Sequence, residues 1–499
     1  MGKTVIDFLR DVVNKFPDKV ACIDDEEQCT YRQLWDASGI IATNLSGWIK
    51  VGQPMPVYMK KSCKTLKLIW GIIRAGGCYC IVDAALPEVR IHDILKVIDA
   101  TSIVCSLQSA NKKLPEYIQI LTYEELCKQN KPEKVYDNMI YDTLPLYIMF
   151  TSGSTGVPKG VVVSHGAVAN FISEFVNCFK ICEEDIIGNQ APWDFDVSVK
   201  DIFTAARTGA TIRIISKKYF SFPMDLAKLL DESKVTILTW AVSALCILSS
   251  SGVLDKHRPQ FIRKVIFSGE VMPIKQLQIW KKRYPDAQFV NVYGPTEVTC
   301  NCTYYILNEL EDMQVIPIGQ PFYGERVFLF DENNEIISKE LPDTIGEICV
   351  SGNNLALGYY GNEEETNKCF VQNPNNMCYR DIVYRTGDLA YYNDQGELCY
   401  SGRKDFQIKH LGHRIELNEI EGQIEKCEGV IVVRCVYINQ KIYAIYSGTV
   451  SITDLDRYLR KKLPSFMIPS KYVQKERMPY NLHGKIDRNA LREEIERDV

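Results

Sequence analysis

Short runs of apolar residues alternate with amphipathic stretches along much of the chain. The runs have the length of strands, and the stretches between them have the length and periodicity of helices. Strands that alternate with helices are typical of parallel sheets with helical crossovers. The pattern therefore predicts an α/β architecture with largely parallel sheets, with apolar runs at 56–59, 118–121, 211–215, 235–238 and 263–267.

Beyond about residue 310 the pattern changes to strand-like segments separated by turn signals, as at 327–334 and 394–396. These segments predict a β-rich subdomain within the same large unit. After Arg403 the order becomes helix, two strands and helix, at 417–427, 430–437, 443–446 and 452–463. We therefore predict a large N-terminal domain of stacked α/β sheets over residues 1–403 and a small α+β C-terminal domain over residues 404–499.

Composition narrows the class of protein. The chain has 499 residues, of which 46% are hydrophobic and 24% charged, as in soluble globular proteins with more than one domain. Its formal net charge of -5 gives no sign of the basic face that binds nucleic acid. The most apolar stretch, 66–82, is interrupted by Arg74 and a glycine pair, so it cannot span a membrane as one apolar helix. We expect a cytoplasmic protein that binds neither nucleic acid nor membranes.

The 18 cysteines are scattered along the chain. The closest pairs, Cys78/Cys80 and Cys300/Cys302, lack the repeated paired spacing of a zinc site. We therefore expect buried, reduced thiols in a cytoplasmic protein.

Residues 151–160, Thr-Ser-Gly-Ser-Thr-Gly-Val-Pro-Lys-Gly, are the sharpest local signal. Glycines let the backbone approach an anion closely, hydroxyls can donate to phosphate oxygens, and Lys159 adds positive charge. The segment is not a Walker loop, because Pro158 precedes the lysine and residues 161–163 have the pattern of a strand. It predicts a hairpin-like phosphate clamp.

This loop resembles the phosphate-binding loop of the adenylate-forming superfamily. That superfamily includes acyl-CoA synthetases, luciferases, adenylation domains of nonribosomal peptide synthetases and D-alanine–carrier-protein ligases. The resemblance covers essentially the whole chain, because further motifs follow in the family's order: Ala-Gly-Gly-Cys-Tyr at 75–79, Tyr-Gly-Pro-Thr-Glu at 293–297, Tyr-Arg-Thr-Gly-Asp at 384–388, Gly-Arg-Lys-Asp at 402–405, Gly-His-Arg-Ile-Glu at 412–416, Leu-Pro-Ser-Phe-Met at 463–467 and Gly-Lys-Ile-Asp at 484–487.

The resemblance implies an ATP site and a bound Mg2+. Asp388 would accept hydrogen bonds from the ribose hydroxyls, Thr296 would donate to the α-phosphate, and Glu297 would hold the metal ion. The residues implied to bind ATP or AMP are Thr151, Ser152, Gly153, Ser154, Thr155, Gly156, Lys159, Asn291, Tyr293, Gly294, Asp388 and Arg403.

The implied reaction has two halves: attack of a carboxylate on the α-phosphate of ATP, and then attack of a thiol on the acyl-adenylate. Lys485 would neutralise the charge that develops in the first half, together with Thr296 and Glu297. In the family the small domain rotates about a hinge, here at Asp405, between the two halves. Gly412 would then line the passage for the carrier's thiol arm.

The segment 194–199, Asp-Phe-Asp-Val-Ser-Val, resembles enzymes that activate amino acids, in which an aspartate meets the substrate ammonium. Asp196 holds that place. The residues implied to line the substrate pocket are Asp196, Val197, Lys200, Thr239, Ile266, Ser268, Gly269, Val292, Cys300 and Asn301.

The side chain of the substrate stays open between two readings. Asp196 and Lys200 are four apart, so on a helix both would face the pocket. A buried ammonium needs an anion, which favours an acidic amino acid. If Lys200 instead pairs with Asp194 or Asp201, or reaches solvent, the pocket fits alanine or another small amino acid.

The branch of the family also stays open. Amino-acid adenylation as in peptide synthetases is the first reading, with a D-alanine–carrier-protein ligase as the alternative. The segment 267–273 resembles such ligases, although Ser268 stands where a cysteine is common. An acyl-CoA ligase has no use for Asp196, and a non-catalytic homologue would be expected to lose Lys485 or Glu297. After Arg488 the sequence has a short charged helix and no carrier attachment motif, so the expected partner is a phosphopantetheinylated carrier protein in trans, unless the chain is cut from a longer one.

Overall fold

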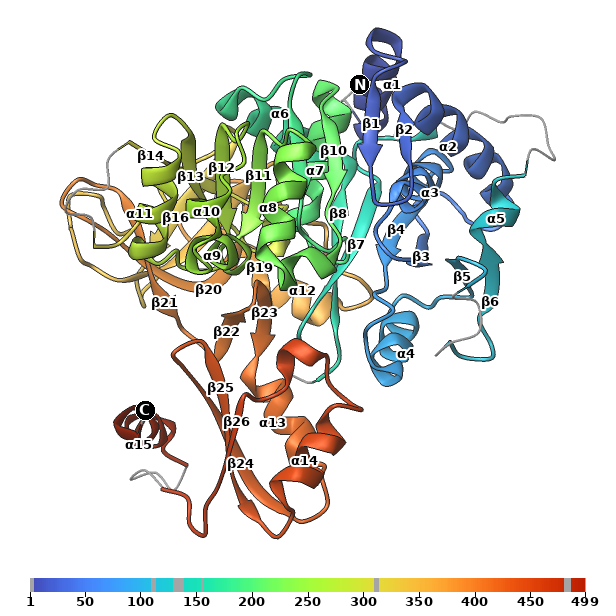
Figure 1. The fold of residues 1–499 in the computed structure, drawn as a ribbon. Helices are drawn as coiled ribbons and strands as arrows, with labels where there is room; N and C mark the ends of the chain where they lie inside the picture. The colour runs from blue at the N-terminus through green and yellow to red at the C-terminus, as the bar shows by residue number, and fades with distance from the viewer. Residues whose placement is uncertain are drawn as a thin grey trace.

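The computed structural model describes residues 4–108, 114–128, 139–153, 156–308, 314–479 and 486–498. A mixed sheet of nine described strands forms one layer of the large unit (Figure 1). Its inner strands are parallel, and β14, β15 and β2 at its ends are antiparallel. In spatial order the strands are β15 (Gln320–Pro321), β14 (Thr303–Leu307), β13 (Gln288–Tyr293), β12 (Lys264–Ser268), β11 (Ile237–Ala241), β9 (Ile186–Asn189), β10 (Thr211–Ile214), β1 (Val20–Ile23) and β2 (Gln28–Thr30).

A second sheet, of seven described strands, forms another layer. Its order is β18 (Gly358–Tyr359), β8 (Lys159–Ser164), β7 (Pro145–Thr151), β4 (Cys78–Ile81), β3 (Pro54–Tyr58), β5 (Ser102–Cys105) and β6 (Gln119–Thr122). The strands from β7 to β6 are parallel, whereas β8 and β18 are antiparallel to their neighbours. The predicted α/β architecture with largely parallel sheets is confirmed.

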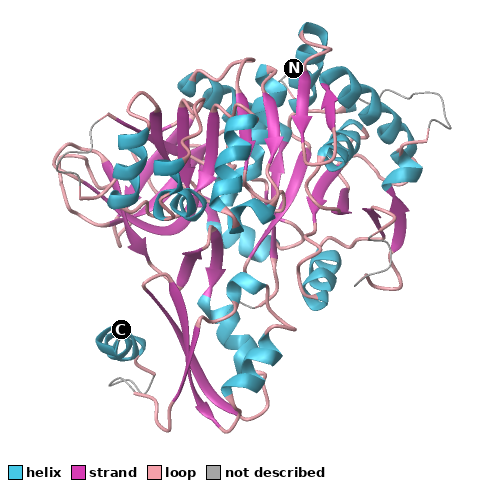
Figure 2. Cartoon of the chain, viewed as in Figure 1, coloured by secondary structure: helices cyan, strands magenta, loops and turns pink. Residues whose placement is uncertain are grey.

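Helices fill the space between these sheets and cover their outer faces (Figure 2). One apolar cluster joins both sheets to α1 (Val5–Lys15), α2 (Tyr31–Leu45), α3 (Cys63–Arg74), α6 (His165–Phe179) and α7 (Val197–Thr208). The outer face of the nine-stranded sheet packs against α8 (Pro223–Glu232), α9 (Val242–Ser250), α10 (Val253–Lys256) and α11 (Ile274–Arg283). On the outer face of the seven-stranded sheet lies α4 (Glu88–Val97), while α5 (Tyr123–Leu126) follows β6.

Local signals explain where some of these elements begin. Thr30 caps the start of α2 with a capping box. Its hydroxyl accepts a hydrogen bond from the Gln33 amide, and the Gln33 side chain accepts one from the Thr30 amide. Strand β11 begins two residues later than the sequence predicted. The chain is still closing helix α8 there, with Lys234 in the left-handed region (φ 53) and the Val235 amide bonded to the Leu230 carbonyl.

The predicted β-rich subdomain is a five-stranded antiparallel sheet within the described residues. It comprises β16 (Glu325–Phe330), β17 (Gly346–Gly352), β19 (Phe370–Gln372), β20 (Ile382–Tyr392) and β21 (Leu398–Arg403). Helix α12 (Glu363–Cys369) lies between β18 and β19 in the chain. The subdomain brings Asp388 on β20 beside Arg403 on β21.

The remainder of the chain has its own hydrophobic clusters, which among the described residues draw only on positions from Ile408 onward. It starts with the hairpin β22 (Gln407–His410) and β23 (His413–Glu416), which runs toward the sheets in Figure 1. The elements that follow are α13 (Leu417–Glu425), β24 (Val430–Ile438), β25 (Lys441–Gly448), α14 (Ile452–Leu459), β26 (Lys471–Gln474) and α15 (Arg488–Asp498). Short 3-10 helices lie at Lys217–Ser221, Thr296–Val298 and Ser465–Met467.

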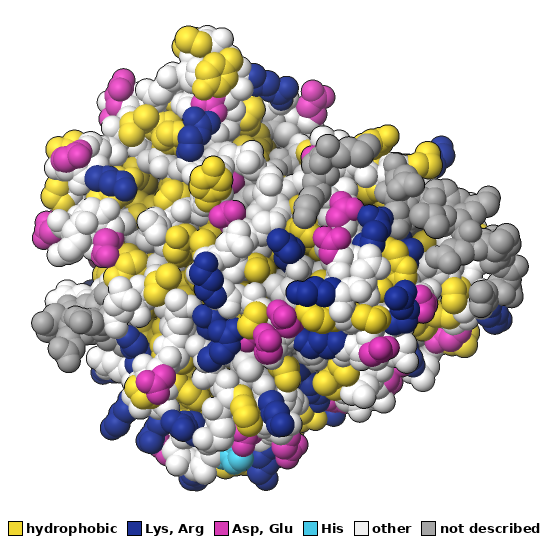
Figure 3. Space-filling view, turned by 90° about the horizontal axis from the view of Figure 1, so that it is seen from above, with side chains coloured by type: hydrophobic (Ala, Val, Ile, Leu, Met, Phe, Trp, Pro, Cys, Tyr) yellow, Lys and Arg dark blue, Asp and Glu magenta, His cyan; other side chains and the backbone are white. Residues whose placement is uncertain are grey.

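The surface carries charges of both signs. Basic and acidic side chains are interspersed over the face seen in Figure 3. Within the described residues, no helix is long and apolar enough to cross a membrane.

Candidate active site

The phosphate loop connects the antiparallel strands β7 and β8, so the predicted hairpin is present. Its geometry requires glycine at Gly153, where an added Cβ would lie 2.0 Å from the Val157 carbonyl oxygen. Gly156 lies in the left-handed region with φ +82. Ser154 and Thr155, also expected to bind phosphate, lie outside the described residues.

Two side chains of this loop bind residues from distant segments of the chain. The Ser152 hydroxyl donates to the Arg414 carbonyl at 3.0 Å and accepts from the Glu416 amide at 3.1 Å, which ties the loop to β23. Lys159 forms an ion pair of 2.5 Å with Glu365 on α12. The loop is therefore fixed from the C-terminal hairpin on one side and from α12 on the other.

A buried cluster surrounds Asp388, the residue expected to bind ribose. One carboxylate oxygen accepts from the Tyr293 hydroxyl at 2.5 Å, and the other accepts from Arg403 at 2.6 Å. Arg403 also forms a two-pronged ion pair with Asp405, at 2.7 and 2.8 Å. The implied nucleotide residues are thus linked directly to the implied hinge residue.

Glu297, the expected metal ligand, is buried and engaged on both oxygens. Tyr359 donates to it at 2.7 Å, and Arg414 on β23 forms an ion pair of 2.8 Å. Burial alone would raise the pKa of Glu297, but the Arg414 guanidinium and the Tyr359 hydroxyl hold it below its usual value. An ionised carboxylate next to the Thr296 hydroxyl fits Mg2+, which proteins hold through one or two carboxylates plus substrate phosphates.

The turn of the β22/β23 hairpin reaches into the site. Gly412 at the turn has φ +81, and its amide donates to Glu270 at 2.7 Å. A Cβ at this glycine would lie 3.3 Å from the Cβ of Ala241. His413 stacks on Phe466, with ring centroids 3.7 Å apart, and burial lowers its pKa to about 4.

A small cavity of about 40 Å³ lies under this turn. Asp196, at the start of α7, lines it and accepts a hydrogen bond from Thr296. Burial raises the pKa of Asp196, against the lowering effect of Thr296 and Lys200. The other expected substrate residues that line this cavity are Val197, Ser268, Gly269, Cys300 and Asn301.

Lys200 is buried and points at this lining. Its Nζ donates to the Asn301 side-chain oxygen at 3.0 Å and approaches the Ser268 hydroxyl at 3.3 Å. No ion pair joins it to Asp194 or Asp201 in the part of the chain that the structure describes. Its hydrogen-bond partners are therefore neutral, while the buried carboxylates of Asp196 and Asp201 are close enough to interact with its charge.

Some of the expected residues lie elsewhere. Thr239 donates to the Asp201 carboxylate, and Ile266 packs in the core, so neither lines the cavity. Val292 lines a larger cavity of about 530 Å³, as do Asn291, Tyr293 and Asp405, whereas Gly294 and Arg403 line both cavities. Asn291 donates its side-chain amide to the Pro317 carbonyl at 2.8 Å. Lys485 lies outside the described residues.

The structure also brings in residues that sequence reasoning did not assign. Arg414 pairs with Glu297, Glu270 accepts from the Gly412 amide, and Glu419 on α13 pairs with Arg90 at 2.7 Å. Arg90 and Arg414 both belong to segments that match family motifs. Their partners follow only from how the hairpin and α13 pack against the rest of the chain, which no local pattern predicts.

The glycine-rich hairpin loop, the buried Asp388–Arg403 pair and the buried Glu297 carboxylate are the features expected of an enzyme that binds a nucleotide. The chain belongs to the AMP-binding enzyme family, which matches residues 9–360. The resemblance to adenylate-forming enzymes, predicted from the motifs, is confirmed.

Several relatives match almost the whole chain. Zwittermicin A synthase ZmaJ of Bacillus cereus is 30% identical over 98% of this chain and 95% of its own length. D-alanine--D-alanyl carrier protein ligase of Staphylococcus aureus (strain Newman) is 30% identical over 98% of this chain and its full length, 100%. Bacitracin synthase 1 of Bacillus licheniformis is 32% identical over 96% of this chain, which spans only 9% of that relative. The chain likewise spans less than half, 45%, of Tyrocidine synthase 1 of Brevibacillus parabrevis.

Solved structures support the fold alone, because they are under 25% identical. Holo-PA1221, a nonribosomal peptide synthetase protein containing adenylation and carrier domains, has a TM-score of 0.85 at 24% identity, over 99% of this chain and 84% of that one. IdnL1 has a TM-score of 0.83 at 23% identity, over 95% of this chain and 99% of that one. Both likenesses run through the C-terminal part as well as the stacked sheets.

Proposed function

We propose that this chain activates an amino acid with ATP, forming an aminoacyl-adenylate and pyrophosphate, and then transfers the acyl group to the phosphopantetheine thiol of a carrier protein in trans. The observation that carries the proposal is Asp196, a buried carboxylate that lines a small cavity beneath the Gly412 turn. A substrate ammonium would stabilise its charged form, which burial disfavours. The carboxylate of the same substrate would face the α-phosphate beside Thr296.

We propose an acidic side chain for the substrate. Lys200 is buried with two neutral hydrogen-bond acceptors, and Asp196, which also interacts with its charge, would be taken by the substrate ammonium. An anion brought by the substrate would therefore stabilise the buried cation. Glutamate or aspartate would place a carboxylate between Lys200 and Asn301. The second candidate is D-alanine, which the small volume of about 40 Å³ favours.

The residues that we assign to ATP are those that the resemblance implies, and the geometry above is compatible with them. Asp388 would exchange its bonds with Arg403 and Tyr293 for the ribose hydroxyls, and the 151–160 loop would surround the phosphates. Glu297 would hold Mg2+, which neutralises charge on the phosphates when bound. Arg414 now occupies that carboxylate, so hairpin docking and metal binding exclude each other at Glu297.

This exclusion supports the proposed division of the chain into residues 1–403 and a rotating domain of residues 404–499. With the hairpin docked, Gly412 lies at the cavity, where a side chain would press on Ala241 and narrow the passage that we propose for a thiol arm. The other orientation would release Glu297 and bring Lys485 to the site. Asp405, which pairs with Arg403, would lie at the start of the moving part.

Amino-acid-dependent exchange of pyrophosphate into ATP tests the proposal, with the proteinogenic and D-amino acids tried one at a time. We expect strong exchange with glutamate or aspartate, and its loss in Asp196→Asn. Asp194→Asn is the matched control, since Asp194 lies two residues away and does not line the cavity. Exchange with D-alanine alone would favour the second candidate, and no exchange with any amino acid would overturn the proposal.

A further inference from the structure

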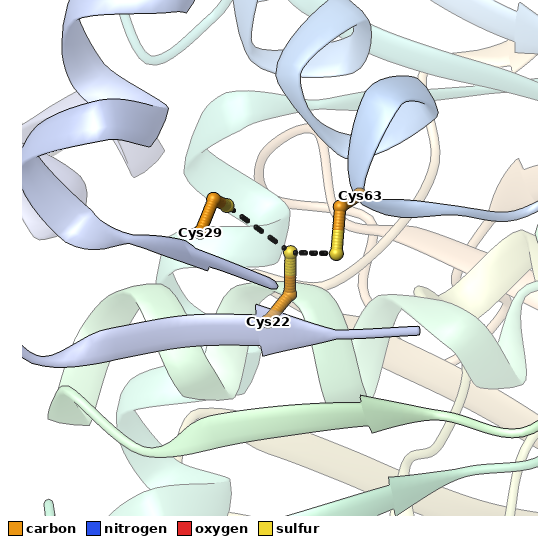
Figure 4. Close-up of side chains that lie close together, drawn as sticks. All are labelled: Cys22, Cys29 and Cys63. Carbon is orange, nitrogen blue, oxygen red and sulfur yellow. Dashed lines mark hydrogen bonds between the residues drawn. The ribbon is translucent and has the colours of Figure 1, made fainter. Parts of the chain in front are cut away.

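Three cysteines from three different elements converge at one point, outside the candidate active site (Figure 4). Cys22 lies on β1, Cys29 on β2, and Cys63 in the first turn of α3. The Sγ of Cys22 is 2.8 Å from that of Cys63 and 3.3 Å from that of Cys29. All three sulfur atoms lie within 4.8 Å of one another, and all three residues are at most 2% exposed.

The fold places these sulfurs together, although the sequence separations of 7 and 41 residues form no known ligand pattern. Cys22 and Cys29 are cross-strand partners in the antiparallel register of β1 and β2. Side chains that are directly opposite on such strands project to the same face of the sheet. Helix α3 packs on that face and contributes Cys63 from its N-terminal turn, where backbone amides favour a thiolate.

Oxygen atoms and one lysine side chain lie close to the three sulfur atoms. The Cys63 amide donates to Asp24 at 2.8 Å, and the Cys63 thiol lies 3.6 Å from the Glu27 carbonyl. The carboxylates of Asp24 and Glu27 lie within 4.8 Å of the Cys63 sulfur and of each other. Lys67, one turn further along α3, pairs with Glu27 at 3.0 Å.

This arrangement fits a metal ion better than the alternatives. Three cysteines that served only as small apolar side chains would not need to point at one another. A disulfide would use two sulfurs, leave the third unused and need an oxidant to reach buried thiols. Three thiolates match a soft ion of the zinc type, and the net negative charge of such a complex is offset by Lys67 and the start of α3.

We propose that Cys22, Cys29 and Cys63 bind one Zn2+ ion as three thiolates, with an oxygen of the Asp24–Glu27 segment or a water molecule as the fourth ligand. Each thiol that binds loses its proton to the solvent, and no electron is transferred. The ion would fasten the β1/β2 hairpin to α3, at the end of the nine-stranded sheet. This inference is independent of the proposed function.

Zinc titration of the full chain, purified under reducing conditions and freed of metal with a chelator, tests the site. Calorimetry and elemental analysis should give one Zn2+ per wild-type chain. Cys29→Ser should weaken binding at least about tenfold. Cys105→Ser, which changes a buried strand cysteine outside the cluster, should bind as the wild type does.

A second measurement on the wild type keeps the test independent of any misfolding in Cys29→Ser. Cd2+ added to the metal-free protein should give an ultraviolet thiolate-to-cadmium absorption that saturates at one equivalent and corresponds to three thiolates. Failure of the wild type to bind either ion would overturn the proposal. So would unchanged binding in a folded Cys29→Ser, or a Cys22–Cys63 disulfide in the freshly isolated, metal-free chain.

Discussion

Lys200 and Asp196 lie one helical turn apart at the start of α7, and both side chains are buried. Their four-residue spacing was enough to predict that they share a face, because side chains at i and i+4 on a helix do so. The partners of Lys200 were not predictable in the same way. Asn301 and Ser268 reach it from two other segments, and Thr239, expected beside it, is instead bound to Asp201.

Lys200→Met should change the choice of substrate. If Lys200 meets an acidic side chain, its loss leaves a buried carboxylate without a partner, so activation of glutamate or aspartate should fall about 30-fold or more relative to alanine. Ratios of kcat/KM from pyrophosphate exchange measure this effect. Lys264→Met is the control, because Lys264 on neighbouring β12 is also buried and donates to a side-chain amide oxygen, that of Gln288. An unchanged ratio in Lys200→Met would contradict the acidic pocket.

At the scale of the element, the β22/β23 hairpin contributes Gly412 and Arg414 to the candidate site. Gly412→Leu should spare pyrophosphate exchange and block loading of a carrier, because the side chain would project toward Ala241 in the passage. Gly396→Leu is a matched control, since Gly396 also has positive φ (+70) but has open space around it. Both variants carry similar backbone strain. Normal carrier loading by Gly412→Leu would contradict the assignment of the passage.

Arg414→Met should alter the dependence on Mg2+. Without the guanidinium, docking of the hairpin would leave Glu297 buried and unpaired, so the docked state should lose population. The concentration of Mg2+ at half-maximal exchange should then fall at least about threefold, because the metal-binding fraction rises. Arg385→Met, which removes the ion pair with Glu347 in the β-rich subdomain, should leave it unchanged. An unchanged Mg2+ requirement in Arg414→Met would count against mutual exclusion.

Acidification should weaken the packing of His413. Burial, helped by Lys217 and His410 and opposed by Asp83, lowers the pKa of His413 from 6.5 to about 4. The unfolded chain therefore binds the proton more readily, and stability is lost as the pH falls from about 6.5 toward 4. The free energy of unfolding of His413→Gln, measured by urea titration at pH 7, 5.5 and 4, should fall about 1–3 kcal/mol less than that of the wild type over this range.

His165 is the internal comparison for that experiment. Burial also lowers its pKa to about 4, but it lies at the start of α6, away from the hairpin. His165→Gln should also reduce the pH dependence of unfolding, because it removes another histidine that is buried in its neutral form. If His413→Gln keeps the full pH dependence of the wild type, the hairpin histidine is not buried in its neutral form.

For the whole molecule, the sequence predicted the architecture because its signals are local. Apolar runs at 211–215 and 263–267 correspond to strands β10 and β12, and the loop at 151–160 joins two strands as expected. Contacts between distant segments were not predictable. The pairing of Arg90 with Glu419, that of Glu297 with Arg414, and the meeting of three widely spaced cysteines depend on how the parts pack.

The packing of the C-terminal part against the large unit bears directly on the proposed two-step reaction. One site would catalyse both half-reactions. The face of the C-terminal part that lies against the site would determine which of the two takes place. The structure has the Gly412 face at the cavity and the Arg403–Asp405 pair at the junction. The face that carries Lys485 would serve the first half-reaction alone.

The most direct test is to measure both half-reactions in Lys485→Ala and in the wild type. We predict that the variant loses adenylate formation, seen as pyrophosphate exchange with the preferred amino acid, by at least about a hundredfold. It should still transfer the aminoacyl group from the preformed adenylate to a phosphopantetheinylated carrier at close to the wild-type rate. Equal loss of both half-reactions in a folded Lys485→Ala, or the loss of neither, would contradict the account.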